Sequence, residues 1–184
     1  MPAIVSMLRG VNLGGHNKIK MDALRTMCAS LKLGSAQTHL QSGNVVFTTD
    51  ERDVRKLAKR MEDGIEKKFG FRVAVVLRTT AEMREVVERN PFSKRKDIEP
   101  SKLLVTFLGE EISLETRKQL EAIKVGPEEI KAFSRELYVY FPNGQGQSKL
   151  YAPMDRILKK TGTGRNWNSV TKLTEMAEEL ESEE

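Results

Sequence analysis

The 184-residue chain carries 31 lysine and arginine residues against 26 aspartate and glutamate residues, a formal net charge of +5, and 39% of its residues are hydrophobic. This balance excludes an intrinsically disordered chain, and no apolar run approaches the roughly 18 residues that cross a bilayer. The single cysteine cannot form an internal disulfide. Together these features predict a cytoplasmic protein with no membrane partner.

The first half of the chain alternates short apolar runs with segments of helical periodicity. The expected elements are a strand at 3–8, a helix at 21–31, strands at 36–41 and 45–49, a helix at 54–69 and a strand at 72–77. Gly34 and Gly70 are expected to end the two helices, and Ser42-Gly43-Asn44 predicts the turn of a hairpin. The order strand, helix, strand, strand, helix, strand predicts a ferredoxin-like βαββαβ unit.

The second half repeats this order in part, so the expected fold class is α+β: a ferredoxin-like first half followed by a second, related α+β half with C-terminal helices. Its expected elements are a helix at 80–90, a strand at 103–108, a helix at 113–123, strands at 129–133 and 136–141, and helices at 148–160 and from 168 onward. Ser113 and Asn168 are the expected N-caps. The predicted domains are 1–79 and 102–184, with 80–101 as a connecting helix and linker.

Topology brings polar residues together in the first half. In a βαββαβ unit with right-handed crossovers, the loop after the first strand and the hairpin between the second and third strands lie at the same end of the sheet. Glycines and a helix N-terminus at that end suit an anion. The candidate ligand-binding residues there are Arg9, Asn12, Asn17, Lys18, Gln41, Ser42 and Asn44. The alternative is that Gly and Asn only shape tight turns and cap a helix.

Several of these residues also carry a family resemblance. The segments Leu8-Arg9-Gly10-Val11-Asn12-Leu13-Gly14-Gly15, Asn17-Lys18-Ile19-Lys20-Met21, Gln41-Ser42-Gly43-Asn44-Val45-Val46-Phe47, Ser148-Lys149-Leu150 and Arg165-Asn166-Trp167-Asn168-Ser169 resemble the bacterial family called Domain of Unknown Function 1697. The resemblance implies a two-part α+β fold of cytoplasmic bacterial proteins and supplies no activity. It adds Lys149, Arg165 and Asn166 to the candidate ligand-binding residues, since the signature draws on both ends of the chain.

Catalytic and metal-binding signals are weak. His16 lies in the polar loop without an obvious carboxylate partner, and Ser42 has no neighbouring base in sequence. One cysteine and two separated histidines match no metal-ligand spacing, so no metal and no cofactor are expected. Cys28 lies on the apolar stripe of the first helix and is predicted to be a buried, inert thiol.

The favoured hypothesis is the binding of a small anionic ligand, phosphate- or nucleotide-like, at the polar site. One alternative is an enzyme that acts on a phosphorylated small molecule through the same residues. Another is a nucleic-acid-associated module that uses the basic body of the chain. Nucleic acid is less favoured, because Phe47 is the only aromatic residue in the predicted strands of the first half and Trp167 is expected to pack in the core. The oligomeric state is left open.

Overall fold

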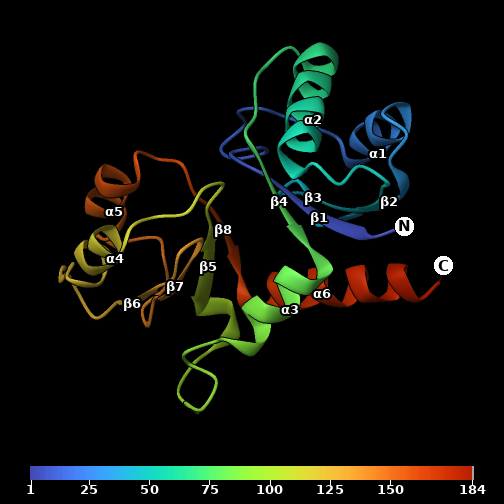
Figure 1. Ribbon diagram of the computed structural model, residues 1–184. Helices are drawn as coiled ribbons and strands as arrows, with labels where there is room; N and C mark the ends of the chain where they lie inside the picture. The colour runs from blue at the N-terminus through green and yellow to red at the C-terminus, as the bar shows by residue number, and fades with distance from the viewer. Residues whose placement is uncertain (184) are drawn as a thin grey trace. The chain divides into compact units, whose positions relative to one another are not determined.

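The computed structural model describes residues 1–183 and divides the chain into two units. Unit 1 comprises Met1–Glu85 together with the C-terminal segment from Thr171, and unit 2 comprises Val86–Val170. Figure 1 shows the helices and strands of both units. Within the described residues, no helix is both long and apolar enough to cross a membrane.

Unit 1 contains a four-stranded antiparallel sheet in the order β2-β3-β1-β4. Its elements are β1 (Ala3–Leu8), α1 (Met21–Ser30), β2 (Gly34–His39), β3 (Asn44–Thr48), α2 (Val54–Phe69) and β4 (Val75–Thr79). This is the predicted ferredoxin-like topology. Alternate residues of the strands, such as Ile4 and Phe47, form one core cluster with Leu24 of α1 and Leu57 of α2, because successive strand residues point to opposite faces.

Unit 2 contains a second four-stranded antiparallel sheet in the order β6-β7-β5-β8. A 3₁₀ turn at Pro100–Lys102 precedes β5 (Leu103–Phe107), α4 (Leu114–Glu121), β6 (Glu129–Ala132), β7 (Glu136–Tyr140), α5 (Tyr151–Leu158) and β8 (Thr163–Asn166). The element order and strand order repeat those of unit 1, so the expectation of two related halves is confirmed. The core on one face of this sheet includes Leu104, Leu137 and Val139 with Leu120 and Met154 of the helices.

The last strand of each sheet continues directly into a helix. β4 runs into α3 (Thr80–Glu88), and β8 runs into α6 (Trp167–Ser182). Thr79 and Glu82 form a reciprocal pair at the start of α3, in which the backbone N–H of each donates to the side chain of the other at 2.8 and 3.2 Å. At the corresponding place in unit 2, the Asn166 side-chain oxygen accepts the Ser169 N–H at 2.9 Å.

Three local predictions differ from the structure. Gly34 does not end a helix; it opens β2, where a Cβ would lie 2.5 Å from the Thr48 hydroxyl oxygen, so close packing requires glycine. The strand β8 was not expected, because Thr163-Gly164-Arg165-Asn166 has no apolar residue to reveal it. Asn168 is not the N-cap of the last helix, because α6 begins at Trp167 and Asn166 accepts the capping bond. The predicted cap at Ser113 is confirmed by the Thr116 N–H, 3.1 Å from its hydroxyl.

Candidate functional site

The polar loop and the hairpin lie together at one end of the unit 1 sheet, as the topology predicts. The Leu8 N–H donates to the Gly43 carbonyl at 2.9 Å, and the Asn12 side-chain amide donates to the Gln41 carbonyl at 2.6 Å. Gly43 is required at this contact. Its φ is +77°, and a Cβ would lie 2.6 Å from the Val11 side chain and 2.8 Å from the Leu8 Cβ.

Asn12 connects three parts of this end of the unit. Besides Gln41, its amide nitrogen reaches the Ile19 carbonyl at 3.0 Å, and its side-chain oxygen accepts the Ile19 N–H at 2.8 Å. Its φ of 55° lies in the left-handed region that asparagine tolerates better than most residues. Both amide protons are therefore donated to the backbone, and Asn12 holds the loop in shape.

The other two asparagines also bind the backbone. Asn44 is buried, and its amide donates to the His39 carbonyl at 3.0 Å and to the Ser42 hydroxyl at 2.9 Å. Asn17 donates to the Gly10 carbonyl at 3.3 Å. The three predicted asparagines thus have the turn-shaping role that the sequence left open as the alternative.

Two cations also lie at this end of the sheet. Lys18 is exposed and Arg9 is half-buried. No aspartate or glutamate occurs among residues 9–21 or 37–49. The two connected segments therefore contribute only positive charge, which attracts anions.

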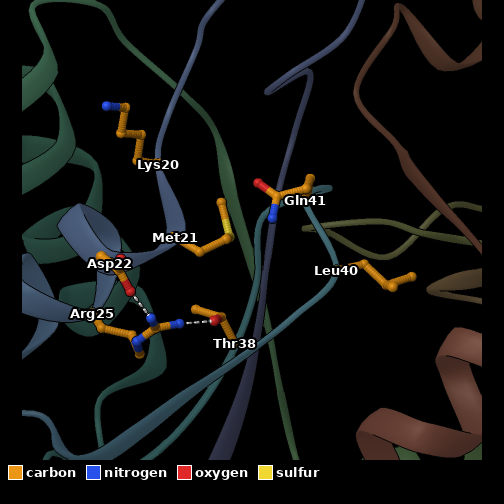
Figure 2. A pocket seen from close by; sticks show the side chains of 7 residues that line it. All are labelled: Lys20, Met21, Asp22, Arg25, Thr38, Leu40 and Gln41. Carbon is orange, nitrogen blue, oxygen red and sulfur yellow. Dashed lines mark hydrogen bonds and ion pairs between the residues drawn. The ribbon is translucent and has the colours of Figure 1, made fainter.

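A pocket of about 490 Å³ adjoins this cluster, between the start of α1 and the end of β2 (Figure 2). Its lining residues are Lys20, Met21, Asp22, Arg25, Thr38, Leu40 and Gln41. This volume falls in the range of pockets that hold small molecules. Gln41 is the one member of the predicted site that lines it.

Arg25 crosses the pocket and joins its two walls. Its guanidinium donates to the Thr38 hydroxyl and to the Asp22 carboxylate, as the dashed lines in Figure 2 show. Lys20 is the N-cap residue of α1, and its side chain makes no capping bond. The first N–H groups of this ten-residue helix therefore receive no bond from the side chain of their N-cap residue, and the helix dipole adds partial positive charge beside Lys20.

The three remaining predicted site residues belong to unit 2, where two of them have local structural roles. Arg165 is buried on β8, and its Nη1 donates to the Thr163 hydroxyl at 2.8 Å and to the Gly164 carbonyl at 2.9 Å. Burial lowers the pKa of its guanidinium to about 10. Asn166 caps α6. Lys149 is exposed next to Ser148, whose hydroxyl donates to a Glu128 carboxylate oxygen at 2.5 Å.

A family model described as a protein of unknown function, DUF1697, matches residues 1–138. The chain belongs to this family. The match ends within β7, so the segments at 148–150 and 165–169 that contributed to the sequence resemblance lie outside it. No curated protein matches the chain.

A solved structure shows the same fold as this DUF1697 protein. The structure of conserved bacterial protein SP0830 from Streptococcus pneumoniae superposes with a TM-score of 0.74 at 20% sequence identity, covering 97% of this chain and 99% of the other. At that identity the likeness establishes the fold alone. The function of the DUF1697 protein must therefore be argued from its own residues.

The histidines and the cysteine of this DUF1697 protein are not among the residues that line the pocket. Residues 1–183 hold no cluster of His, Cys, Asp or Glu that could bind a metal ion. His16 is exposed, and its backbone N–H donates to Leu13. His39 lies on β2, where burial and the nearby charge of Lys172 lower its pKa. Cys28 is buried in the core as predicted, and burial raises the pKa of its thiol to about 11.

The part of unit 2 that corresponds to the pocket, between β5 and α4, differs in loop length, charge and helix capping. The connection from β5 to α4 spans only residues 108–113 and contains Glu110 and Glu111, whereas the corresponding connection in unit 1 spans residues 9–20. Ser113 caps α4 in unit 2, whereas no side chain caps α1. The long basic loop and the uncapped helix are thus features that unit 1 has and unit 2 lacks.

Sequence reasoning missed Lys20 and Arg25, although a signal for them exists. Lys20 directly precedes the first helical residue, and Arg25 follows at the second turn, so both side chains can reach the N-terminal end of α1. The glycine-rich loop ends at Lys18, whereas Lys20 and Arg25 are recognisable only from their positions at the start of the helix.

Proposed function

We propose that this DUF1697 protein binds a small anionic ligand, phosphate- or nucleotide-like, in the pocket at the start of α1. One observation carries the proposal: Lys20, Arg25 and the uncapped N-terminus of α1 line the same pocket as Gln41. Backbone N–H groups at a helix start together with a lysine and an arginine form an arrangement that suits phosphate oxygens.

The chemistry of the lining defines what the ligand must displace. Arg25 is bound to the Asp22 carboxylate, whose side chain is 91% exposed. An ion pair with such an exposed partner contributes little, so an incoming phosphate can replace Asp22 on the guanidinium. Gln41 offers an amide that can donate or accept, and Met21 and Leu40 give the pocket an apolar side.

A thermal-shift and calorimetric screen tests the proposal. Inorganic phosphate, nucleoside monophosphates and phosphosugars are titrated into the protein, and a ligand at 100 times its Kd is expected to add about 2.7 kcal/mol of stability. Lys20→Ala is expected to weaken binding at least fivefold. Lys124→Ala, which removes an exposed lysine of unit 2, is the matched control and leaves binding unchanged. Absence of binding by all three ligand classes would contradict the proposal.

We also propose that the protein is cytoplasmic and bacterial, in line with its family resemblance. The buried thiol of Cys28, the one cysteine of the chain, fits a reducing compartment. Cell fractionation of the source organism with an antibody to the protein tests this location, and recovery in the membrane or secreted fraction would contradict it.

A further inference from the structure

β2 is an edge strand of the unit 1 sheet, since it pairs only with β3. Its bonding pattern follows from the register. Backbone bonds join Leu8 to Gly43 and Pro2 to Thr49, directly before and after β3. Both β3-side partners are odd-numbered, so the odd-numbered residues of β3 bond to β1. Because bonded and non-bonded pairs alternate in an antiparallel ladder, the even-numbered residues of β3 bond to β2.

At this edge, the backbone groups of Thr38 are the ones that point outward. Gln37 and His39 lie opposite Val46 and Asn44, so their backbone groups face β3. The N–H and C=O of Thr38 therefore point away from the sheet, and outside the strand ladders no backbone bond joins them to any of residues 1–183. This outward pair lies beside the pocket, because the Thr38 hydroxyl binds Arg25 there.

The equivalent edge in unit 2 is protected. The N–H of Ala132 on β6 donates to the Glu121 carboxylate of α4 at 2.8 Å. β6 also carries Glu129 and Lys131, and Arg95 bonds both oxygens of Glu129 at 2.8 Å. Charged side chains of this kind block the addition of another strand. β2 is Gly-Ser-Ala-Gln-Thr-His and has no Asp, Glu, Lys, Arg or Pro.

The surroundings of β2 indicate the chemistry of a partner. Leu40, at the end of the strand, is 59% exposed, and Lys20 and Arg25 lie across the pocket from it. A partner that covers this edge must supply backbone bonds, an apolar side chain and a negative charge. Residues 9–25 and 34–44 contain no Phe, Tyr or Trp, so the aromatic platforms that stack nucleic-acid bases are missing.

We propose that the β2 edge is a docking site for an extended peptide segment of a partner protein. The segment adds a strand beside Thr38 and places an acidic side chain in the pocket, against Lys20 and Arg25. Main-chain bonds then give affinity and the side-chain pocket gives selectivity, as in other strand-addition complexes. The bulge between Gly34 and Gln37 limits the regular part of the edge to Gln37–His39, so the added strand is short. The acidic anchor rests on the proposed anion site, whereas the added strand does not.

A display library of random 12-residue peptides selected against the whole protein tests this proposal, with the affinities of recovered peptides measured by fluorescence polarisation. The expected peptides carry an acidic residue next to an apolar one. Thr38→Pro, which removes the outward N–H, is expected to weaken them at least tenfold. Thr38→Ser keeps both the backbone N–H and the hydroxyl that binds Arg25, so it is expected to change affinity less than threefold. Lys20→Ala is expected to weaken acidic peptides more than neutral analogues.

Amide hydrogen exchange in the wild-type protein gives a readout that does not depend on a variant folding. Peptide binding is expected to slow exchange at Thr38 by at least tenfold and to leave Ile130 on β6 unchanged. A selection that returns no peptide overturns the proposal, as do peptides that leave Thr38 unprotected. If exchange at Thr38 slows when the protein concentration alone is raised, without peptide, a second copy of the protein occupies the edge, and the proposal is overturned too. Oligonucleotide binding that protects Thr38 assigns the edge to nucleic acid and also overturns it.

Two outcomes separate this inference from the proposed anion site. Phosphate binding without peptide binding refutes this inference alone. Peptide binding that does not depend on Lys20, with no phosphate binding, refutes the anion site.

Discussion

Arg78 and Arg165 hold the same position in the two sheets. Arg78 on β4 lies opposite Val5 of β1, and Arg165 on β8 lies opposite Val105 of β5. Each Nη1 donates to the carbonyl of the preceding residue at 2.9 Å, and the two residues are 1% and 7% exposed. The last strand of each unit thus carries a buried guanidinium just before it continues into a helix.

This equivalence predicts that the two arginines matter equally for stability. Arg78→Ala and Arg165→Ala each remove a long buried side chain with its hydrogen bonds, and each is expected to lower the free energy of unfolding by about 3 kcal/mol. Arg72→Ala, which breaks only the exposed ion pair with Glu66, should change it by less than about 1 kcal/mol. Urea unfolding measures all three. A loss near that of Arg72→Ala for either buried arginine would refute the shared role.

Gly43 gives a second prediction about stability. Gly43→Ala meets both a left-handed φ and close contacts to Leu8 and Val11, so we expect a loss of about 3 kcal/mol. Gly70→Ala has a similar φ of 82° but open space around the added methyl, so its loss should be about 1 kcal/mol. Equal losses in the two variants, measured by thermal unfolding, would show that the close contacts of residue 43 with Leu8 and Val11 add nothing to the loss of stability.

Cys28 makes the stability of the protein depend on pH. The pKa of its thiol rises from 9.0 to about 11 on folding, so the unfolded chain loses this proton first. The contribution of the neutral thiol is complete below pH 9 and is lost as the pH rises from 9 to 11, by about 3 kcal/mol in all. Cys28→Ala should lack this part of the decline. Identical slopes for both proteins in urea titrations across this range would contradict the burial argument.

Asp22 is expected to oppose anion binding. Asp22→Asn removes a negative charge from the pocket and weakens the competing bond to Arg25, so phosphate or nucleotide affinity should rise about fivefold at low salt. The gain should shrink as salt is added, because screening weakens the exposed carboxylate's effect. Glu115→Gln on α4, outside the pocket, is the control. Calorimetric titration that finds weaker binding to the Asp22→Asn protein would contradict the assigned pocket.

Asn12 is predicted to act through structure and not through the ligand. Asn12→Ala removes the side-chain bonds to Gln41 and Ile19 and places alanine at a left-handed φ, so the free energy of unfolding should fall by about 2 kcal/mol. Phosphate affinity, measured below the melting temperature, should change less than threefold. A large loss of affinity at unchanged stability would return Asn12 to the ligand-binding set.

The hydrophobic pattern predicted most of the fold, because the core residues of each element recur at helix or strand spacing along the sequence. Leu24, Leu57 and Val139 are examples. It could not reveal β8, whose buried residues are Thr163 and Arg165. Their burial depends on hydrogen bonds and on pairing with β5, which are long-range features.

The sequence predicted which segments meet at this end of the sheet but not which of their side chains bind the backbone. Crossover geometry correctly placed the loop beside the hairpin. It could not tell which polar side chains the backbone would use, and Asn12 and Asn44 became bound to carbonyl groups. Lys20, Arg25 and Gln41, which line the pocket, meet only when the start of α1 lies against the end of β2.

The chain passes from unit 1 to unit 2 and back again, after Glu85 and after Val170, and both passages lie inside helices, α3 and α6. Unit 1 is therefore discontinuous in sequence, and a single cut cannot release it. A cut after Glu85 detaches residues 1–85 from the rest of the chain, so that only packing within unit 1 holds them to its C-terminal segment, and a protease must first unwind helical backbone to cut there. In a digestion experiment, cuts at both passages should therefore be needed before unit 2 separates from both segments of unit 1.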